Sequence, residues 1–484
     1  KKHQVISYQV HHHAYIDFRD MLKGSAQRVN SGGTQGLLGS EGKNKTDGAG
    51  ASATAVVVKW PKVKFSTFEG CPKVVTSTFE RAGWVQTQDD KDWNVGWFGV
   101  SQVRSMFHPD SGVRLGDLQM VNHYPNHLEL CHKALMAKNI KRFMRDTRDA
   151  AEENGPTRSI LAATGLGEFT YKDGYIPMTY NLPADYNIFL EEYKRNPSSW
   201  WIMKPQNGLQ GKGIFLVNKL SQLKKWSTKA PGLPAYIISR YISNPLLIGG
   251  KKFDLRLYVL VTSYRPLRVY QYLHGFARFC NVKYSAELSD LDNPYMHLTN
   301  VAIQKSNSDY NSAHGGKWHI RDLRLWIEST QGAEASDTLF SNMNRLIVHS
   351  LLACQDVIVN DRHCFECYGY DLLIDDDLKP WLVEVNASPS LSPSTHSDKV
   401  MKQNLIRDVY RIVVPPDAQG WAEWRGANNT GPMKDVGSFV VLFDQAAQEA
   451  SAAKENHEGT KSSGAADADD DDDALPPRSL LGKM

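Results

Sequence analysis

The clearest pattern of hydrophobic and polar positions lies between Tyr368 and Pro389. Two apolar runs, YGYDLLI and PWLVEVN, flank a polar segment at 375–379, and this arrangement predicts a β-hairpin. With the turn centred between Asp377 and Leu378, Asp371 lies directly opposite Glu384. One face of the hairpin then carries the polar side chains. The other face, which we expect to be buried, carries Tyr370, Leu372, Ile374, Trp381, Val383 and Val385.

The polar face of this hairpin carries Asp371, Glu384 and Asn386. Two carboxylates at the distance of a cross-strand pair, about 5 Å, repel each other, and burial increases that cost. A hard cation neutralises such a pair, and two carboxylates with an amide oxygen form a ligand set for Mg²⁺. The alternative is a solvated hairpin edge whose acids face water. The hairpin by itself does not decide between them.

Alternation and helical periodicity predict further elements along the chain. Strands are expected over 55–60, 63–65, 199–205, 235–242, 253–263 and 267–273. Helices are expected over 74–81, 132–145, 183–195, 320–329, 337–358 and 397–413, with residues 150–182 as a loop. The pattern therefore favours a mixed α/β (α+β) fold.

Composition divides the chain into five ranges. Residues 1–55 form an N-terminal extension with a Gly- and Ser-rich insertion that we expect to be disordered. The ordered ranges are an N-terminal α/β domain at 56–136, a central domain at 137–242 and a C-terminal domain at 243–415. The range 416–484 is expected to be a disordered acidic tail, since six of the seven residues 467–473 are Asp.

Charge and cysteine content exclude several classes of function. The net charge of +3 over 484 residues gives no electrostatic reason to expect nucleic acid. The six cysteines show no disulfide framework, and Cys364 and Cys367 lack the second pair of ligands that a zinc site needs. No run of 18 apolar residues and no signal peptide is present, so we expect no membrane insertion and a soluble, cytoplasmic protein.

A glycine-rich segment follows the strand that carries Lys204. Glycines at 208, 211 and 213 allow backbone N–H groups to approach phosphates, and Lys204 and Lys212 supply positive charge. The segment is not a P-loop, because no Ser or Thr follows the lysine and a strand follows in place of a helix. An ordinary hairpin is the alternative. Together with the carboxylate hairpin, the segment suggests a nucleotide held between two β-layers.

The strand at 253–263 begins with alternating charges. Lys252, Asp254 and Arg256 share one face, which taken alone is also consistent with a salt-bridge ladder. Arg278 is flanked by apolar residues and needs an anionic partner. The segment 297–300 adds small polar groups suited to a phosphate or a metal-bound water. Cations thus precede Mg²⁺-type acids, the order expected for phosphoryl transfer by positioning and electrostatics.

Several long blocks of the chain resemble the tubulin tyrosine ligase-like family of the ATP-grasp superfamily. They are WIMKPQNGLQGKGIFLVNKLSQLKKWS, ISRYISNPLLIGGKKFDLRLYVL, HLTNVAIQK, HCFECYGYD and WLVEVNASPSL. The stretch DWNVGWFGV…VNHYPNHLELCHKALMAKNIKRF extends the likeness to about residues 60–415. Within the family, the chain is most similar to the glutamylase branch that serves as the catalytic subunit of a multi-protein tubulin polyglutamylase complex.

The resemblance implies a fold and a reaction. The fold is an ATP-grasp fold in three lobes, with the nucleotide held between two antiparallel β-layers. The activity is that of an ATP- and Mg²⁺-dependent tubulin polyglutamylase. ATP phosphorylates the γ-carboxylate of a glutamate in the tubulin C-terminal tail, and the α-amino group of free glutamate then attacks the acyl phosphate to form an isopeptide bond. Because the substrate would be tubulin, the resemblance implies a location at the cytoskeleton. The glutamylase branch further implies the axoneme or basal body of a cilium or flagellum.

The resemblance also implies roles for individual residues. ATP phosphates would contact Lys138 and Lys204, beneath a closing loop of Gln210, Gly211, Lys212 and Gly213. The adenine edge would be formed by Arg240, Tyr241 and Ile242. Nucleotide and substrate would meet Lys252, Asp254 and Arg256, and Arg278 would hold the incoming carboxylate or the acyl phosphate beside Thr299 and Asn300. Magnesium would be bound by Asp371, Glu384 and Asn386.

Two departures from the family pattern leave alternatives open. Many members carry Arg-Glu-Gly where this chain has Leu273, His274 and Gly275, so the shape of the amino-acid pocket is not fixed. A ligase for glycine or tyrosine and a non-catalytic axonemal scaffold are the other readings. The region after Pro415 is short and ends in an Asp run that an acidic tubulin tail would repel, so we expect accessory subunits to provide microtubule targeting. The sequence does not distinguish initiation from elongation, or α- from β-tubulin.

Overall fold

The computed structural model describes part of the chain, namely residues 62–152, 174–208, 211–226, 234–287, 290, 292–308, 310, 316–414 and 431–451. These residues belong to one compact unit, Trp60–Met484. The predicted N-terminal extension, the predicted strand at 55–60 and Gln210 lie outside the described residues. The described part contains three β-sheets, which we call the N-terminal, middle and large sheets.

The N-terminal sheet is parallel and has the strand order β2-β1-β3-β4. Its strands are β1 (Lys64–Thr67), β2 (Val85–Gln86), β3 (Val95–Trp97) and β4 (Met120–Val121). Helices α2 (Lys73–Arg81) and α3 (Val100–Met106) and the 3-10 helix η1 (Pro109–Ser111) lie in its connections. On α2, Val74, Val75 and Phe79 recur at helical spacing and are buried against the sheet. This is the α/β arrangement that the sequence predicts for the N-terminal range.

The middle sheet is antiparallel, with the order β5-β8-β6-β7. Its elements are β5 (Thr179–Leu182), α8 (Tyr186–Arg195), β6 (Trp201–Pro205), β7 (Phe215–Val217), the 3-10 helix η2 (Leu220–Trp226) and β8 (Tyr236–Arg240). The prediction of a loop over 150–182 is wrong at β5. That short strand is stabilised by its ladder with β8, about 60 residues further along the chain, and a local pattern cannot show such a pairing.

The large sheet has eight antiparallel strands built around β10 (Lys251–Tyr264). The other strands are β9 (Leu247–Ile248), β11 (Leu267–Tyr272), β12 (Phe276–Phe279), β13 (Lys317–His319), β14 (Glu366–Ile374), β15 (Pro380–Asn386) and β16 (Phe439–Asp444). The remaining helices are α4 (Leu128–Cys131), α5 (Lys133–Glu152), α9 (Pro294–His297), α10 (Val301–Gln304), α11 (Ile320–Gln331), α12 (Ala333–Gln355) and α13 (His396–Val413).

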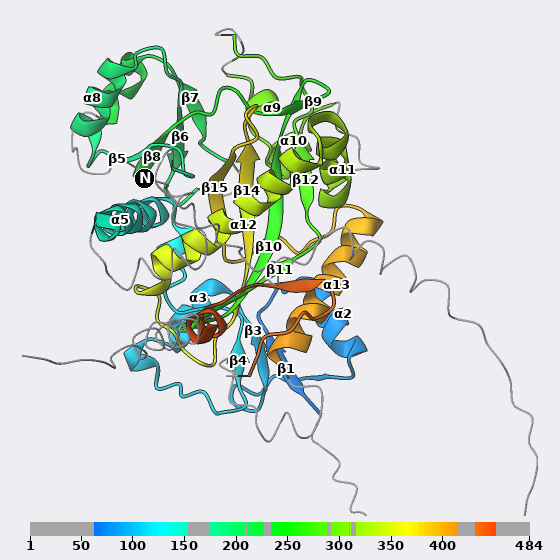
Figure 1. Cartoon of the computed structure of the whole chain (residues 1–484). Helices are drawn as coiled ribbons and strands as arrows, with labels where there is room; N and C mark the ends of the chain where they lie inside the picture. Colours follow the sequence, from blue (N-terminus) through cyan, green and yellow to red (C-terminus); the bar gives the residue numbers. More distant parts are fainter. Residues whose placement is uncertain are drawn as a thin grey trace, which may run out of the picture. The chain divides into compact units, whose positions relative to one another are not determined.

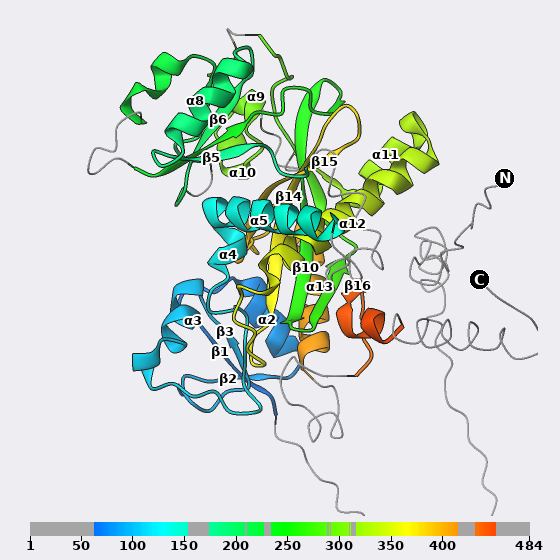
Figure 2. The same ribbon diagram turned by 60° about the vertical axis from the view of Figure 1, so that its left-hand side comes forward.

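Strand β10 is buried on both faces. Leu255 and Leu257 pack into one hydrophobic cluster together with residues of α12, which crosses the large sheet in Figure 1. Tyr258 and Leu260 point to the opposite side and join a second cluster with α2, α13 and the N-terminal sheet. Figure 2 shows α5 between the middle sheet and α12, in agreement with its contacts to β5 and α12. One strand therefore connects the two main cores.

The predicted hairpin is confirmed, including the pairing of Asp371 with Glu384. Its predicted apolar face is wrong at Trp381 and Val383, which are only half-buried, whereas Leu382 is 1 % exposed. The reason is an irregularity in the ladder between Asp371 and Leu372, which shifts the register so that Leu372 faces Leu382. A β-bulge of this kind changes which side chains of the bulged strand point inward.

The prediction of a disordered tail from residue 416 is wrong at β16. This strand pairs antiparallel with β11 over Arg268–Tyr272, and Phe439 is completely buried in the second core. The run FVVLFD has strand composition but lies beyond a range with little pattern, so its partner could not be recognised locally. Residues 452–484, including the Asp run, lie outside the described residues. No helix of the described part is long and apolar enough to cross a membrane.

Candidate active site

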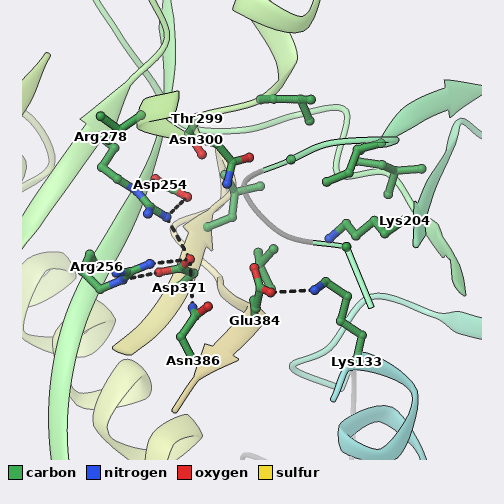
Figure 3. Close-up of a pocket in the computed structure, with 18 of the residues that line it drawn as sticks. Lys133, Lys204, Asp254, Arg256, Arg278, Thr299, Asn300, Asp371, Glu384 and Asn386 are labelled. Atoms are coloured by element: carbon green, nitrogen blue, oxygen red, sulfur yellow. Dashed lines mark hydrogen bonds and ion pairs between the residues drawn. The ribbon is translucent and has the colours of Figure 1, made fainter. Parts of the chain in front are cut away.

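A cavity of about 690 Å³ lies between the middle sheet and the large sheet. It brings together most of the residues that the sequence and the resemblance indicated. Those in its wall are Lys204, Gly211, Lys212, Arg240, Tyr241, Ile242, Lys252, Asp254, Arg256, Arg278, Thr299, Asn300, Asp371, Glu384 and Asn386. Figure 3 shows Lys133 and Lys204 on one side of the site and Arg256 and Arg278 on the other, with Asp371 and Glu384 between them.

A network of buried ion pairs forms one wall of the cavity. Arg256 on β10 donates to both carboxylate oxygens of Asp371 on β14, at 2.6 and 3.0 Å. Arg278 on β12 donates to both oxygens of Asp254 at 2.8 and 2.5 Å and lies 3.0 Å from Asp371. The ladder explains the geometry, since Asp254 pairs with Arg278 and Arg256 pairs with Asp371 across neighbouring strands. Asp254 and Arg256 of the predicted charged face thus form ion pairs with the neighbouring strands, and these pairs face the cavity.

The network changes the protonation equilibria of its members. Burial alone would raise the pKa of Asp371, but the guanidinium groups of Arg256 and Arg278 lower it to about 2. In return, despite burial, the carboxylates of Asp254 and Asp371 raise the pKa of Arg278, and Asp371 raises that of Arg256. Asp371 and the two arginines are therefore charged at neutral pH, and their charges line this wall of the cavity.

Glu384 on β15 lies opposite Asp371 but has a different partner. Its carboxylate accepts a hydrogen bond of 2.6 Å from the ammonium group of Lys133, at the start of α5. Sequence reasoning missed Lys133 and proposed Lys138, whose side chain is exposed and lines a separate hollow with Lys141, Arg142 and Arg145. Helical spacing could have indicated the difference, because Lys133 precedes the buried Met136 and Ala137 by three and four residues.

Lys204 and the glycine-rich loop meet at the opposite wall. Lys204 is the last residue but one of strand β6, where it pairs with Ile237 of β8. Burial in the cavity lowers its pKa to about 8. Gly211 has φ +79°, and a Cβ there would lie 2.9 Å from the side-chain oxygen of Asn300. Only glycine fits this conformation at this approach. Gly213, also at positive φ, packs beside Pro205 and is not part of the cavity wall.

A chain of polar contacts holds Lys252 at the start of β10. Its ammonium group donates to the Tyr241 hydroxyl at 2.9 Å and lies 4.4 Å from the centre of that ring. The same hydroxyl is 3.0 Å from Nδ1 of His297, whose Nε2 contacts the carbonyl of Asp290 at 2.9 Å. Burial lowers the pKa values of Lys252 and His297. Tyr241 therefore positions Lys252, which sequence reasoning had not foreseen.

The side chain of Arg240 is held by an ion pair to α8, which does not support its predicted contact with adenine. Its guanidinium donates to Glu192 on α8 at 2.6 Å and lies 5.6 Å above the ring of Trp201. The backbone of Arg240 on β8 is paired with Trp201, and its N–H donates to the carbonyl of Met178 at 2.8 Å. Any contact of residues 240–242 with a nucleotide base would thus come from the backbone beyond β8 and from Ile242.

The oxygen atoms of Asp371, Glu384 and Asn386 suit a hard divalent cation. The amide of Asn386 donates to Asp371 at 3.4 Å, which leaves its own oxygen as the possible ligand. Within the described residues, no three His, Cys, Asp or Glu side chains form a metal-binding group. A cation here would depend on the two carboxylates and the amide oxygen, and it would compete with Lys133 for Glu384 and with the arginines for Asp371. The donor chemistry fits Mg²⁺.

Comparison with known proteins identifies the family. Residues 113–420 match the model of the tubulin-tyrosine ligase family. A Tetrahymena thermophila protein named "Probable alpha-tubulin polyglutamylase Ttll1" is 46% identical over 399 residues, which are 80% of this chain and 94% of that protein. A Bos taurus protein named "Probable tubulin polyglutamylase TTLL9" is 39% identical over 398 residues, covering 75% and 80%. The chain belongs to the tubulin-tyrosine ligase family.

Membership of the tubulin-tyrosine ligase family confirms the predicted class of protein, an ATP-dependent ligase with an ATP-grasp-like fold. The matched range begins just before β4 and ends after α13. It therefore includes the whole middle sheet and every residue of the ion-pair network. Strand β16 lies beyond it, as does most of the N-terminal sheet.

Proposed function

We propose that this ligase is an ATP- and Mg²⁺-dependent tubulin polyglutamylase, which joins free glutamate to glutamates in tubulin C-terminal tails. The observation that carries the proposal is the cavity wall in which Arg256, Arg278 and Asp371 form one buried network beside Glu384. The names of the relatives at 46% and 39% identity supply the substrate. The predicted roles of the site residues form part of this proposal.

The nucleotide occupies the side of the cavity nearest the middle sheet. Lys204 and Lys252 provide positive charge for the phosphates, and the loop approaches them through the backbone of Gly211 and Lys212. Lys133 takes the role first assigned to Lys138, because its ammonium group reaches Glu384 in the cavity. Residues 240–242 border the base. Asn300, between α9 and α10, lies against Gly211 of the loop, and Thr299 lines the cavity beside it.

The reaction takes place between this cationic side and the arginine wall. A γ-carboxylate oxygen of the tubulin tail attacks the terminal phosphorus of ATP, and the bond from that phosphorus to ADP breaks. The α-amino nitrogen of free glutamate then attacks the acyl carbon, phosphate leaves and the amine loses a proton. Arg256 and Arg278 are held rigidly by their acids, so they stabilise the negative charge that develops without first having to reorganise.

Magnesium would be held by Asp371, Glu384 and Asn386, and its chemistry there is the neutralisation of phosphate charge. The contribution of this chain is to hold the two carboxylates opposite each other in the cavity. Asp371 stays ionised because its pKa is lowered to about 2 by the two arginines. Glu384 is opposed by Lys133 at 2.6 Å, which holds its side chain in the cavity.

We further propose that the enzyme acts on the cytoskeleton, in the cytoplasm and at the axoneme or basal body of a cilium. Six of the seven residues 467–473 are Asp, and this run would repel the acidic microtubule surface. Accessory subunits of a polyglutamylase complex would then provide targeting. The partners are tubulin tails, free glutamate and those subunits.

The test is incorporation of labelled glutamate, glycine or tyrosine into microtubules with ATP and Mg²⁺, with and without a ciliary extract. Wild type is compared with Glu384→Gln and with Asp377→Asn, a control in the exposed turn of the same hairpin. We expect glutamate incorporation that needs the extract, is lost in Glu384→Gln and persists in the control. Incorporation of glycine or tyrosine instead would reassign the substrate. Nucleotide binding without incorporation of any of the three amino acids would favour the alternative of a non-catalytic axonemal scaffold.

A further inference from the structure

A buried histidine–glutamate pair lies behind the cavity, apart from the network of arginines and acids. His123 follows β4 and Glu366 begins β14, and their side chains are 2% and 0% exposed. The backbone brings them together, because Val121 forms a parallel bridge with Cys364 and the residues two places further along each segment then lie side by side. Nδ1 of His123 lies 2.5 Å from one carboxylate oxygen of Glu366. Neither residue takes part in the proposed binding of nucleotide, magnesium or tubulin.

The hydrogen bonds around His123 determine which of its ring nitrogens carries the proton. The backbone N–H of Phe98 donates to the side-chain oxygen of Asn122 at 2.8 Å, so the nitrogen of that amide is its donor. This nitrogen lies 3.1 Å from Nε2 of His123. Because an amide nitrogen only donates, Nε2 accepts, and the proton is on Nδ1, which donates to Glu366. The imidazole is then neutral, and Nε2 has a lone pair that can act as a base.

Ser388 connects this pair to the cavity. Its hydroxyl oxygen lies 3.3 Å from Nε2 of His123, and it donates, since Nε2 is an acceptor. Ser388 lines the cavity. The next residue, Pro389, packs against Gly369, and a Cβ at Gly369 would also meet the side chain of Arg256. Ser388 therefore lies between the buried imidazole and the part of the cavity beside the arginine wall.

Glu366 supplies the negative charge that a protonated His123 needs. Its second carboxylate oxygen accepts a hydrogen bond of 2.8 Å from the backbone N–H of Tyr124, and the ring of His127 is centred 5.8 Å from that of His123. An imidazolium here is therefore paired with a carboxylate, which offsets the cost of its burial. The titratable groups that surround the pair are neutral at neutral pH, because burial lowers the pKa of His127 and raises the pKa values of Tyr124, Cys131, Cys364, Cys367 and Tyr368.

We propose that Ser388, His123 and Glu366 form a proton relay that converts the ammonium group of the incoming amino acid into the amine that attacks the acyl phosphate. This inference rests on the proposed function and adds the base that its second step requires. The order of hydroxyl, imidazole and carboxylate is the one in which an imidazole draws a proton from a hydroxyl group. Ser388 is the member that touches the substrate, and His123 and Glu366 act through it.

The relay moves one proton for each amide bond formed. A free amino acid carries its α-amino group mostly as an ammonium ion at neutral pH, which has no lone pair for the attack. The ammonium gives a proton to the hydroxyl oxygen of Ser388 while the hydroxyl proton passes to Nε2 of His123, so Ser388 stays neutral. The freed lone pair bonds to the acyl carbon, and the bond from that carbon to the phosphate oxygen breaks. A second proton of the nitrogen leaves with the phosphate, and the imidazolium later returns its proton through Ser388 to solvent.

Hydroxylamine separates the two half-reactions, because it is uncharged at neutral pH and traps an acyl phosphate as a hydroxamate without a base. The test uses the complex that modifies microtubules and measures amide formation with labelled glutamate and hydroxamate formation with hydroxylamine in its place. We expect Ser388→Ala to lower kcat for glutamate at least tenfold. KM for glutamate and the rate of hydroxamate formation should stay within twofold of wild type. Ser388→Thr keeps the hydroxyl and restores part of the rate, and Ser390→Ala, at an exposed serine of the same segment, is the matched control.

A purely structural role of the pair would lower both products together. His123→Gln can form hydrogen bonds but cannot take up a proton, so it should show the same split between amide and hydroxamate as Ser388→Ala. If this buried variant no longer melts cooperatively, Ser388→Ala decides, because position 388 is exposed. Wild-type amide formation in Ser388→Ala, or an equal loss of both products, overturns the inference. So does a covalent adduct of the tubulin tail with Ser388 during turnover, detected by mass, since Ser388 would then be a nucleophile.

The same measurements separate the relay from the proposed function. If the wild-type complex forms hydroxamate but joins glycine or tyrosine in place of glutamate, the proposed function fails. The relay then stands if Ser388→Ala slows that amide bond and leaves hydroxamate formation unchanged, because every incoming amino acid carries an ammonium group. If the wild-type complex forms neither amide nor hydroxamate, the proposed function and the relay are both wrong.

Discussion

At the scale of single residues, the site depends on charges that are fixed in place before any substrate arrives. Asp371 is the clearest case, because two arginines contact its carboxylate and hold its pKa at about 2. The residue types of this site could be predicted from the sequence, since alternation placed Asp371 opposite Glu384. Their partners could not be predicted, because the pairing of β10 with β12 and β14 joins segments separated by more than 100 residues in one case.

Removal of the Asp371 charge should destabilise the fold. In Asp371→Asn, Arg256 loses the carboxylate that it contacts, whereas Arg278 retains its ion pair with Asp254. Loss of one partner of a buried pair costs about 3–5 kcal/mol. We expect the free energy of unfolding in urea to fall by that amount. Asp377→Asn, at the exposed turn, should leave it unchanged. A change of less than about 1 kcal/mol in Asp371→Asn would contradict the network.

Asp371 should also make the free energy of unfolding depend on pH in the acid range. The folded pKa of Asp371 is lower than that of the unfolded chain, so its contribution to stability is complete above about pH 4. That contribution is lost as the pH falls through about 2. The stability difference between wild type and Asp371→Asn, measured by urea unfolding, should therefore shrink between pH 4 and pH 2. A stability difference that stays constant over this range would show that the arginines do not lower the pKa of Asp371.

Lys204 should make nucleotide binding sensitive to alkaline pH. Its pKa of about 8 means that the free enzyme loses this positive charge above pH 8. Affinity for the ATP analogue should then fall by up to about tenfold per pH unit, because binding must restore the proton. Lys204→Arg keeps its charge and should bind with little pH dependence between 7 and 9.5. If affinity for the analogue falls equally with pH in both proteins, a group other than Lys204 causes the pH dependence.

At the scale of elements, helical and alternating patterns located most of the long helices and strands, with ends shifted by a few residues. The sequence patterns failed for short strands, whose existence depends on a distant partner. β5 was read as loop and β16 as tail, yet each is paired along its length. The bulge in β15 shows a further limit, because one irregular residue exchanged the positions of Leu382 and Val383.

Strand β16 should contribute strongly to stability. Phe439 is fully buried against Tyr270 and Tyr272 of β11, whereas the adjacent Val440 is half-buried. Phe439→Ala should lower the free energy of unfolding by about 3–5 kcal/mol, and Val440→Ala by about 1 kcal/mol. Urea unfolding of the two variants tests this. Equal, small losses would mean that β16 is not part of the folded core.

At the scale of the whole molecule, a ligand in the cavity touches two sheets that are otherwise separate. The nucleotide should therefore stabilise the protein as a unit. An ATP analogue with Mg²⁺ at 100 times its dissociation constant should add about 2.7 kcal/mol to the free energy of unfolding. Melting curves should shift upward by several degrees. Chelation of Mg²⁺ should remove part of the shift in wild type and little of it in Glu384→Gln.

The order of lobes along the chain was available from the family resemblance, and the three sheets follow that order. The exact domain limits remain a prediction. Helix α5 runs from Lys133 to Glu152 and so crosses the expected limit at residue 136. A helix that contacts Glu384 in one sheet and β5 in another belongs to both lobes, and no local signal shows this.

Strand β10 joins the two main hydrophobic cores and also carries Lys252, Asp254 and Arg256. A substitution in this strand must preserve the packing on both of its faces as well as the chemistry of the cavity, so few substitutions are expected to be tolerated there. During divergence of ligases built on this frame, changes in substrate preference are therefore expected to arise mainly outside β10.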